Sequence, residues 1–156
     1  MTGITYIGTC LEVTAADGTA VAETTADSSM VDAAKANSHS KVEVTGVISI
    51  GELGDTAEDV SYNLLKGGRT KHVNGVRDIG DVDVTCEYNA GDAGQNRIRA
   101  LSNSNTTVTF LIKDADDQYT AFNGVVANYR ETPREASSYK GCMFTMRGQS
   151  RLDYGD

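Results

Sequence analysis

Residues 80–101 read GDVDVTCEYNAGDAGQNRIRAL, and this stretch holds the pattern that decides the fold. Apolar and polar residues alternate from Gly80 to Tyr88, which is the period of a half-buried β-strand. A helix is expected directly after it, because Asp92 can cap a helix and Gln95 follows three positions later, close to a capping box. Ile98 and Leu101 give this helix a narrow apolar stripe. The stretch therefore predicts a strand followed by a short helix that packs on the flank of a β-structure.

Further strands are expected on both sides of this pair. They run from Lys41 to Ile50, Val60 to Leu65, Val108 to Ile112, Gln118 to Tyr129 and Cys142 to Met146. The turn Asp114 to Asp117 joins two of them in a hairpin. With 156 residues, 39% of them apolar, the chain fits one domain with a single modest core. The expected core residues are Val42, Val44, Ile48, Val82, Val84, Ile98, Leu101, Val108, Phe110, Phe122, Phe144 and Met146.

The two ends of the chain differ from this central part. Residues 1–40 are expected to form a flexible arm that buries little, with a possible first strand from Ile4 to Val13 and a short helix near Ser29 to Ala36. Residues 41–150 form the predicted β-domain. Residues 151–156, RLDYGD, are polar and are expected to be a frayed tail.

One face of the strand from Gly80 to Tyr88 is strongly acidic. Asp81, Asp83, Thr85 and Glu87 lie opposite the apolar face because side chains alternate along a strand. Carboxylates crowded on one short strand repel each other, so they need solvent or cations from a neighbour. Two interpretations stay open, a strand that faces bulk solvent and a strand that lines an aqueous channel.

A basic segment precedes this strand. Residues 65–78 contain several glycine or asparagine breakers and the four cations Lys66, Arg69, Lys71 and Arg77. This composition predicts a long exposed loop. The part of the arm from Ala15 to Ser40 is acidic, opposite in charge to this loop, and we expect the loop to reach a neighbouring subunit.

No pattern in the sequence indicates an enzyme, a metal site or a cofactor site. His39 and His72 have no recognisable catalytic partner, and the glycine-rich stretches lack the lysine and helix of a phosphate-binding loop. Counted as a calcium loop from Asp114, the sixth and twelfth positions are Tyr119 and Val125, where glycine and glutamate are required. We therefore expect neither catalysis nor a bound cofactor or metal.

Charge, hydropathy and cysteine content argue against several further classes of protein. The net charge of −8 comes from 14 basic and 22 acidic residues, which argues against a conventional nucleic-acid-binding protein. No apolar run is long enough to span a bilayer, and the N-terminus does not read as a secretory signal. Cys10, Cys86 and Cys142 lie within predicted strands and lack metal-ligand spacing, so buried free thiols are expected.

The order of motifs resembles the major tail tube protein of long-tailed, non-contractile bacteriophages, the siphovirus type with a phage-lambda-like tail tube. Three segments carry the resemblance: GDVDVTCEYNAGDAGQNRIRAL, TTVTFLIKDADDQYTAFNGVVANYRE and SSYKGCMFTM, which read strand, helix, strand, turn, strand, loop, strand. The resemblance implies a mainly-β fold, a two-sheet β-sandwich or barrel with one short flanking helix. It also implies hexameric rings that stack into a tube, through which DNA is ejected into the host.

The resemblance further implies partners and a location. The partners are other copies of the chain, the tape-measure protein, the distal tail and tail-terminator proteins, and DNA that passes through the lumen without sequence-specific binding. The location is the tail of a virion assembled in the host bacterial cytoplasm. Two alternatives stay open. One is another tail component of the same fold, a tail terminator or a contractile-tail inner tube subunit. The other is a β-sandwich adhesion or carbohydrate-binding module.

Overall fold

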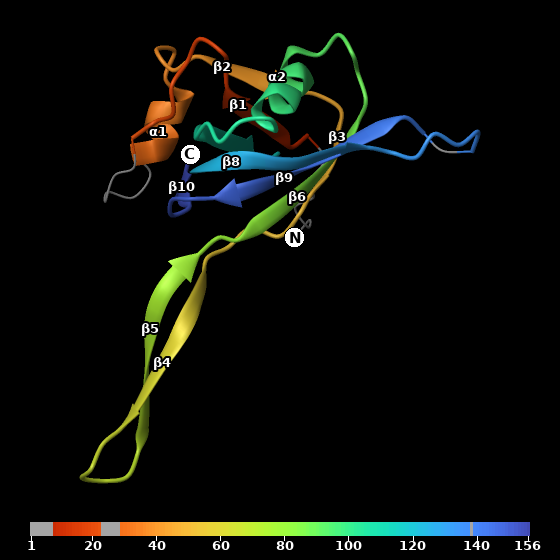
Figure 1. The fold of residues 1–156 in the computed structure, drawn as a ribbon. Coiled ribbons are helices and arrows are strands. Elements are labelled where there is room, and N and C mark those ends of the chain that lie inside the picture. Colours follow the sequence, from red (N-terminus) through yellow and green to blue (C-terminus); the bar gives the residue numbers. More distant parts are fainter. Residues whose placement is uncertain (1–7, 23–28, 138) are drawn as a thin grey trace.

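The computed structural model describes residues 8–22, 29–137 and 139–156, and it is mainly β-structure (Figure 1). The strands are β1 (Cys10–Thr14), β2 (Lys41–Val44), β3 (Val47–Ile50), β4 (Thr56–Asn63), β5 (Thr70–Asp78), β6 (Asp81–Glu87), β7 (Val108–Lys113), β8 (Tyr119–Glu131), β9 (Gly141–Gly148) and β10 (Asp153–Gly155). The helices are α1 (Ser29–Lys35) and α2 (Ala93–Leu101). The expected mainly-β class is confirmed.

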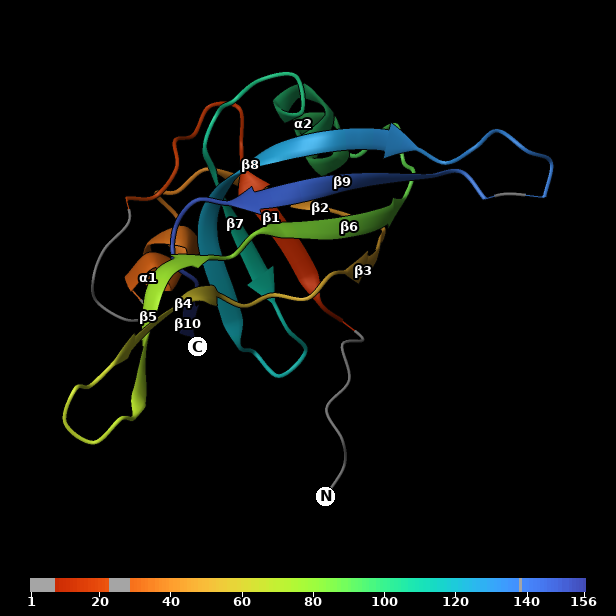
Figure 2. The ribbon, with the colours of Figure 1, turned by 60° about the horizontal axis from the view of Figure 1, so that its bottom comes forward.

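Eight of the strands form one sheet that folds over on itself. Its order is β2-β1-β7-β8-β9-β6-β3, with β10 added beside β8. Strands β2 and β3 lie at opposite ends of this order, yet only Thr45 and Gly46 separate them in the chain. The chain therefore crosses from one edge of the sheet to the other, and β1 and β7 cross β6 and β9 at a steep angle (Figure 2).

Gly46 makes the crossing between β2 and β3 possible. Its backbone has a φ of 74°, a left-handed conformation that glycine adopts without strain. A Cβ atom there would also lie 2.9 Å from the carbonyl oxygen of Glu87. The alternation from Lys41 to Ile50, expected as one strand, is thus divided between the two edges of the sheet.

The core lies between the two layers of the folded sheet. Phe110, Phe122 and Phe144 are its largest fully buried side chains, and the first two rings stand 5.2 Å apart between centroids. The expected core residues on β6, β7, β8, β9 and α2 are all buried there, as is Val44, and Val42 packs against them half-buried. Ile48 is the exception, because 58% of its surface is exposed. A register shift between Val47 and Ser49 where β3 pairs with β6 turns Ile48 out of the core.

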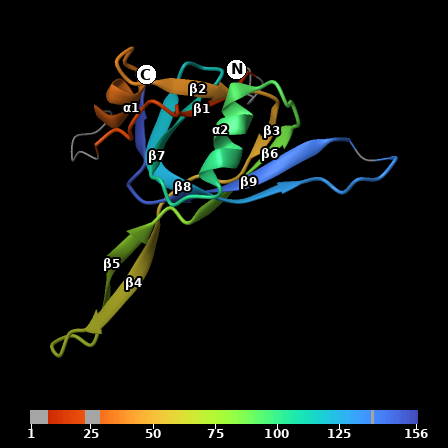
Figure 3. The same ribbon diagram turned by 45° about the horizontal axis from the view of Figure 1, so that its top comes forward.

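Helix α2 closes one open side of the core (Figure 3). Asp92 caps the helix as expected by accepting the backbone N–H of Gln95 at 2.9 Å. The buried amide of Gln95 donates to the carbonyl oxygens of Thr45 (2.8 Å) and Glu87 (2.7 Å) and accepts the N–H of Asn89 (2.9 Å). One side chain therefore links the helix to the crossing after β2 and to the end of β6.

The segment before Lys41 packs more closely than its composition suggests. Met30, Val31 and Ala34 of α1 are fully buried against the outer faces of β7 and β8, where they form a second small core with Leu111 and Ala121. The expected helix is thus present, but the expectation that this region buries little was wrong for these residues. Their spacing gives even a seven-residue helix one apolar side. Residues 4–7 of the expected first strand lie outside the described residues.

The C-terminal residues are also ordered, in contrast to the expected frayed tail. Strand β10 pairs with β8, Leu152 is buried, and the carboxylate of Asp153 is only 2% exposed. Asp153 accepts the backbone N–H of Met30 at 2.9 Å and pairs with Arg151 at 3.0 Å. The polar composition of this segment suggested a solvated tail. In the structure the carboxylate of Asp153 is buried and caps α1.

The expected loop at residues 65–78 is instead half of a long β-hairpin, which we call the β4–β5 hairpin. It forms a separate two-stranded sheet that projects from the body (Figures 1 and 3). Gly67 and Gly68, with φ values of 108° and 63°, make its turn, and Leu64 donates to the carbonyl of Arg69 at 3.1 Å. The glycines that suggested a loop therefore close a hairpin, and the residues after them pair as a strand.

Candidate functional site

The acidic face of β6 consists of Asp81, Asp83, Thr85 and Glu87, and it lies opposite the core as the alternation predicts. The three carboxylates are exposed and Thr85 is half-buried, while Val82, Val84 and Cys86 between them are buried. Strand β9 supplies neighbours for two of the carboxylates. Arg147 lies 3.4 Å from Asp81, and Thr145 donates its hydroxyl to Asp83 at 2.8 Å.

Sequence reasoning missed the contribution of β9 to this face. Met143 stands directly opposite Thr85, Thr145 opposite Asp83, and Arg147 opposite Asp81. The signal was available, because these residues alternate with the buried Cys142, Phe144 and Met146. Which strand would pair with β6 was not readable from the sequence. The face is therefore acidic along β6 with one partly exposed methionine and one arginine beside it.

The β4–β5 hairpin has one apolar and one polar face. Val60 stands opposite Val73, and Tyr62 opposite Lys71, so these four side chains share a face. The other face pairs Asp59 with Asn74, Ser61 with His72 and Asn63 with Thr70. All but one of the residues of β4 and β5 are exposed. On the apolar face, Val60, Tyr62 and Val73 each expose about half their surface. A two-stranded ribbon alone in water is marginally stable, so this apolar face lacks the cover it needs.

The four predicted cations lie along this hairpin. Lys66 and Arg69 flank the glycine turn, and Lys71 and Arg77 lie on β5. Among the described residues, none of the four forms an ion pair with the carboxylates of the acidic face. The two sets of sequence-predicted site residues thus lie on different surfaces of one subunit, the cations on a projection and the carboxylates on the body.

The edge strand β3 is a third surface with unsatisfied pairing capacity. It hydrogen-bonds to β6 on one side, and no strand among the described residues pairs with its other side. Ile48 and Ser49 are exposed there. The opposite edge, β2, is approached by α2, where a Cβ on Gly94 would lie 2.0 Å from the carbonyl oxygen of Glu43. An open edge strand is a template for pairing with another chain.

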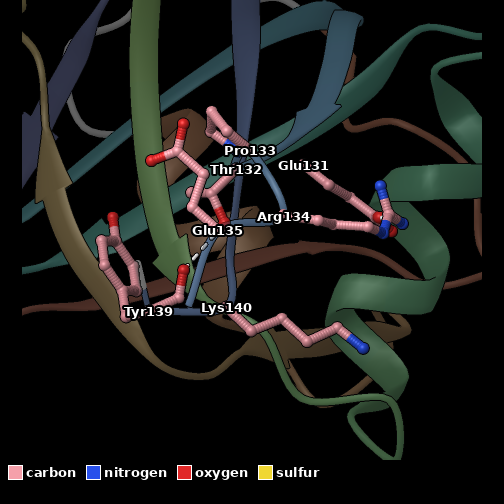
Figure 4. Close-up of a pocket in the computed structure, with 7 residues that line it drawn as sticks. All are labelled: Glu131, Thr132, Pro133, Arg134, Glu135, Tyr139 and Lys140. Atoms are coloured by element: carbon pink, nitrogen blue, oxygen red, sulfur yellow. Dashed lines mark hydrogen bonds and ion pairs between the residues drawn. The ribbon is translucent and has the colours of Figure 1, made fainter. Parts of the chain in front are cut away.

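Two hollows open on the surface of the described residues. The one shown in Figure 4, about 280 Å³, is a crease in the loop between β8 and β9 where Arg134 pairs with Glu131 at 2.6 Å. A second, about 540 Å³, lies at the base of the hairpin beside Arg77 and Asp78. Within the described ranges no cluster of His, Cys, Asp and Glu could hold a metal ion, and no helix there could span a membrane.

Structural comparison places this fold among tail assemblies and injection systems. A chain of the anti-feeding prophage baseplate superposes with a TM-score of 0.66 at 7% identity, covering 99% of this chain and 96% of that one. A chain of the PVC extracellular contractile injection system sheath/tube terminator gives 0.64 at 9% identity, covering 100% and 99%. A chain of the gene transfer agent tail, solved with C6 symmetry, gives 0.62 at 15% identity, covering 76% and 89%.

The fold is that of phage-like tail proteins. This likeness in fold agrees with the resemblance found in the motifs. The similar structures come from contractile systems as well as from the tail of a gene transfer agent particle. No family model matches the sequence, and comparison with curated proteins finds no match. The likeness is therefore one of structure, carried at 15% sequence identity or less.

Proposed function

We propose that this chain is the subunit of a phage-like tail tube, which closes into hexameric rings that stack into a conduit for DNA. The observation that carries the proposal is the full-length structural likeness to chains of tail and injection-system assemblies. The C6 symmetry of the gene transfer agent tail supports a ring of six. In this role the chain is a structural component of a virion tail and not an enzyme.

The β4–β5 hairpin supports the proposal that subunits assemble, because its apolar face is left exposed within one subunit. Its half-exposed Val60, Tyr62 and Val73 share a face with Lys71, and Lys66 and Arg69 lie at its tip, so a partner surface for this end of the hairpin should be apolar and acidic. A neighbouring copy of the chain has a net charge of −8 and so attracts these cations. We assign the hairpin, with Lys66, Arg69, Lys71 and Arg77, to contacts between subunits.

The edge strand β3 supports ring closure. A strand that pairs on one side only is a hazard for a monomer, but it becomes a joining surface when identical subunits close around an axis. Stacking of rings is a contact of the head-to-tail kind, which does not close and therefore builds a filament. Free subunits, rings and tubes are thus the three states to distinguish.

We propose that the acidic face of β6 lines the lumen. Negative side chains repel the phosphates of DNA, so nucleic acid can slide through the tube without sticking. The pairing of Asp81 with Arg147 leaves Asp83 and Glu87 as the carboxylates without a cation partner on this face among the described residues. Asp83 is therefore the most direct probe of the lumen.

We expect Asp83→Lys to leave the subunit folded and able to form tubes, but to make those tubes retain DNA. Exposed surface substitutions usually change the free energy of unfolding by no more than about 0.5 kcal/mol. Retention is measured by co-sedimentation of tubes with short double-stranded DNA, and it should weaken steeply as salt rises. Asp116→Lys makes the same charge change at the exposed β7–β8 turn. Equal DNA retention by both variants would refute the lumen assignment.

A second candidate within the same fold is a tail terminator or the inner tube of a contractile tail. Chains of the PVC sheath/tube terminator and of the anti-feeding prophage baseplate match nearly the whole length of this chain. Chains of the PVC sheath-tube complex, the anti-feeding prophage cap and the gene transfer agent tail match about three quarters of it. The full-length match to the terminator chain is the observation that supports this second candidate. The partners proposed for either role are further copies of the chain, a tape-measure protein, and distal-tail and terminator proteins.

Negative-stain electron microscopy of the purified chain tests the proposal. Long hollow tubes of uniform diameter with six-fold averages are the expected result, and they support the tube subunit. Rings that never stack, even at high protein concentration, would support the terminator instead. Monomers across a range of concentration and salt would defeat both roles and favour an adhesion or carbohydrate-binding module.

A further inference from the structure

A β-bulge in β8 turns Arg130 onto the same face of the sheet as the acidic strand. Ala127 of β8 stands opposite Thr145 of β9. Three residues further along β8, Arg130 stands opposite Met143, which is only two residues from Thr145 on β9. In an unbroken strand, side chains three residues apart lie on opposite faces. The bulge therefore places Tyr129 against the core and Arg130 outward, beside the exposed Met143.

The bulge contains an unusual backbone conformation at Asn128. Its φ is 56°, in the left-handed region, which asparagine tolerates better than most residues other than glycine. The side chain of Asn128 is exposed, so burial of this side chain does not hold the conformation in place. Bulges often re-aim a side chain beside a functional surface, and the side chain re-aimed here is Arg130.

Arg130 and Glu87 carry opposite charges on this face and stay apart within one subunit. Neither forms an ion pair with any of the described residues. On the acidic face, Asp81 already has Arg147 as a neighbour and Asp83 accepts the hydroxyl of Thr145, whereas Glu87 has neither kind of contact within the described ranges. Strand β9 separates β8 from β6, which puts their backbones about 10 Å apart.

The part of β8 that carries Arg130 is an open edge of the sheet. Strand β7 pairs with β8 only as far as Gly124, and on that side no strand in the described part of the chain pairs with residues 125–131. Strands β8, β9, β6 and β3 lie side by side in this order, with β8 and β3 on the outside (Figure 2). Each neighbouring pair is antiparallel, so β8 and β3 also run in opposite directions.

Ring closure brings these two open edges together. When copies related by rotation close around an axis, β3 of one copy meets the open part of β8 in the next, as an antiparallel pair. Arg130 then lies beside the neighbour's β3 and two strands from its Glu87. Ser49 shares the acidic face because it stands opposite Thr85, and its small side chain leaves room for an arginine to extend over β3. Within the subunit the larger Met143 stands in the corresponding place.

We propose that the guanidinium of Arg130 forms an ion pair with the carboxylate of Glu87 in the next copy of the ring. The inference rests on the proposed function, because the pair exists only where two copies meet. One pair forms at each junction, and it fixes the register in which β3 meets β8, since a slip by one residue turns side chains to the other face. The bulge has a role in this arrangement, because without it Arg130 would point to the core side of the sheet.

Exchange of the two charges tests the pair in the full chain. Ring and tube formation is followed by sedimentation velocity and negative-stain microscopy over a range of protein concentration. Arg130→Glu should raise the concentration needed for assembly at least about tenfold, because each junction then brings two carboxylates together. Glu87→Arg should have a similar effect through two guanidinium groups. Arg130→Glu combined with Glu87→Arg restores opposite charges in exchanged places, and it should assemble near the wild-type concentration.

Arg134→Glu is the matched control. It makes the same charge change on an exposed arginine that pairs with Glu131 of its own subunit, and it should assemble like the wild type. Thermal unfolding checks that every variant is folded. The pair is refuted if Arg130→Glu assembles at the wild-type concentration, if Arg134→Glu impairs assembly equally, or if the double variant is as defective as the single ones. Any of these results beside normal wild-type tubes removes only the pair, whereas a wild-type chain that never assembles defeats the proposed function and the pair together.

Discussion

Phe122→Ala is expected to lower the free energy of unfolding by about 3–5 kcal/mol, since truncation of a fully buried phenylalanine removes its transfer energy and leaves a cavity. Phe122 is fully buried and stands opposite Phe110 in the sheet register. The centroids of their rings are 5.2 Å apart, so the cavity would open beside another rigid ring. Urea unfolding followed by circular dichroism gives the change directly.

Ile48→Ala is the matched control for this measurement. Sequence patterning places Ile48 in the core with Phe122, but the structure exposes 58% of its surface. We expect this truncation to cost less than about 1 kcal/mol, in the range of ordinary surface substitutions. A loss of several kcal/mol at Ile48, or less than about 1 kcal/mol at Phe122, would contradict the assignment of faces.

Removal of the β4–β5 hairpin is expected to abolish tube formation while leaving the subunit folded. Ala57 and Arg77 stand opposite each other near the base of the hairpin, so residues 58–76 can be replaced by an Asn-Gly turn without moving either strand end. The deleted part forms its own two-stranded sheet, so its loss leaves the eight-stranded sheet intact. The measurements are thermal unfolding and electron microscopy of the same sample.

A charge variant separates the hairpin's shape from its cations. Lys66→Ser, Arg69→Ser and Lys71→Ser together keep the turn glycines and the apolar pair Val60 and Val73. We expect this variant to need lower salt or higher protein concentration than the wild type to form tubes. Tubes of normal length from the hairpin deletion would remove the hairpin from the proposed contacts altogether.

Local patterns predicted the parts of the fold that depend on neighbours in sequence. The alternation in β6, the cap at Asp92 and the apolar stripe of α2 each act within about ten residues, and each is present in the structure. The pairing partners of those elements were not readable, because register between distant strands is set by packing. This is why the acidic face was found, while Met143 and Arg147 beside it were not.

Two of the errors arose because polar or glycine-rich residues were treated as unstructured, and a third because an alternating segment was treated as one strand. Gly67 and Gly68 supply the left-handed conformations of a hairpin turn, and Thr70 to Asp78 then pair as a strand. Asp153 was expected in a solvated tail, but its charge is used to cap α1. Gly46 divides one alternating segment between two edges of the sheet. In each case a long-range partner decides what the local composition leaves open.

The contact between Asp153 and Met30 also has a consequence for the order in which the chain folds on the ribosome. The two residues are 123 positions apart, so α1 emerges long before its capping carboxylate has been synthesised. A seven-residue helix is too short to persist alone in water, and it stays a transient structure until then. Leu111 and Ala121 therefore stay uncovered from their own synthesis until Asp153 has been made. Strand β10, the last to be made, thus completes the outer layer. Until then a nascent chain exposes an apolar surface that is buried in the finished subunit.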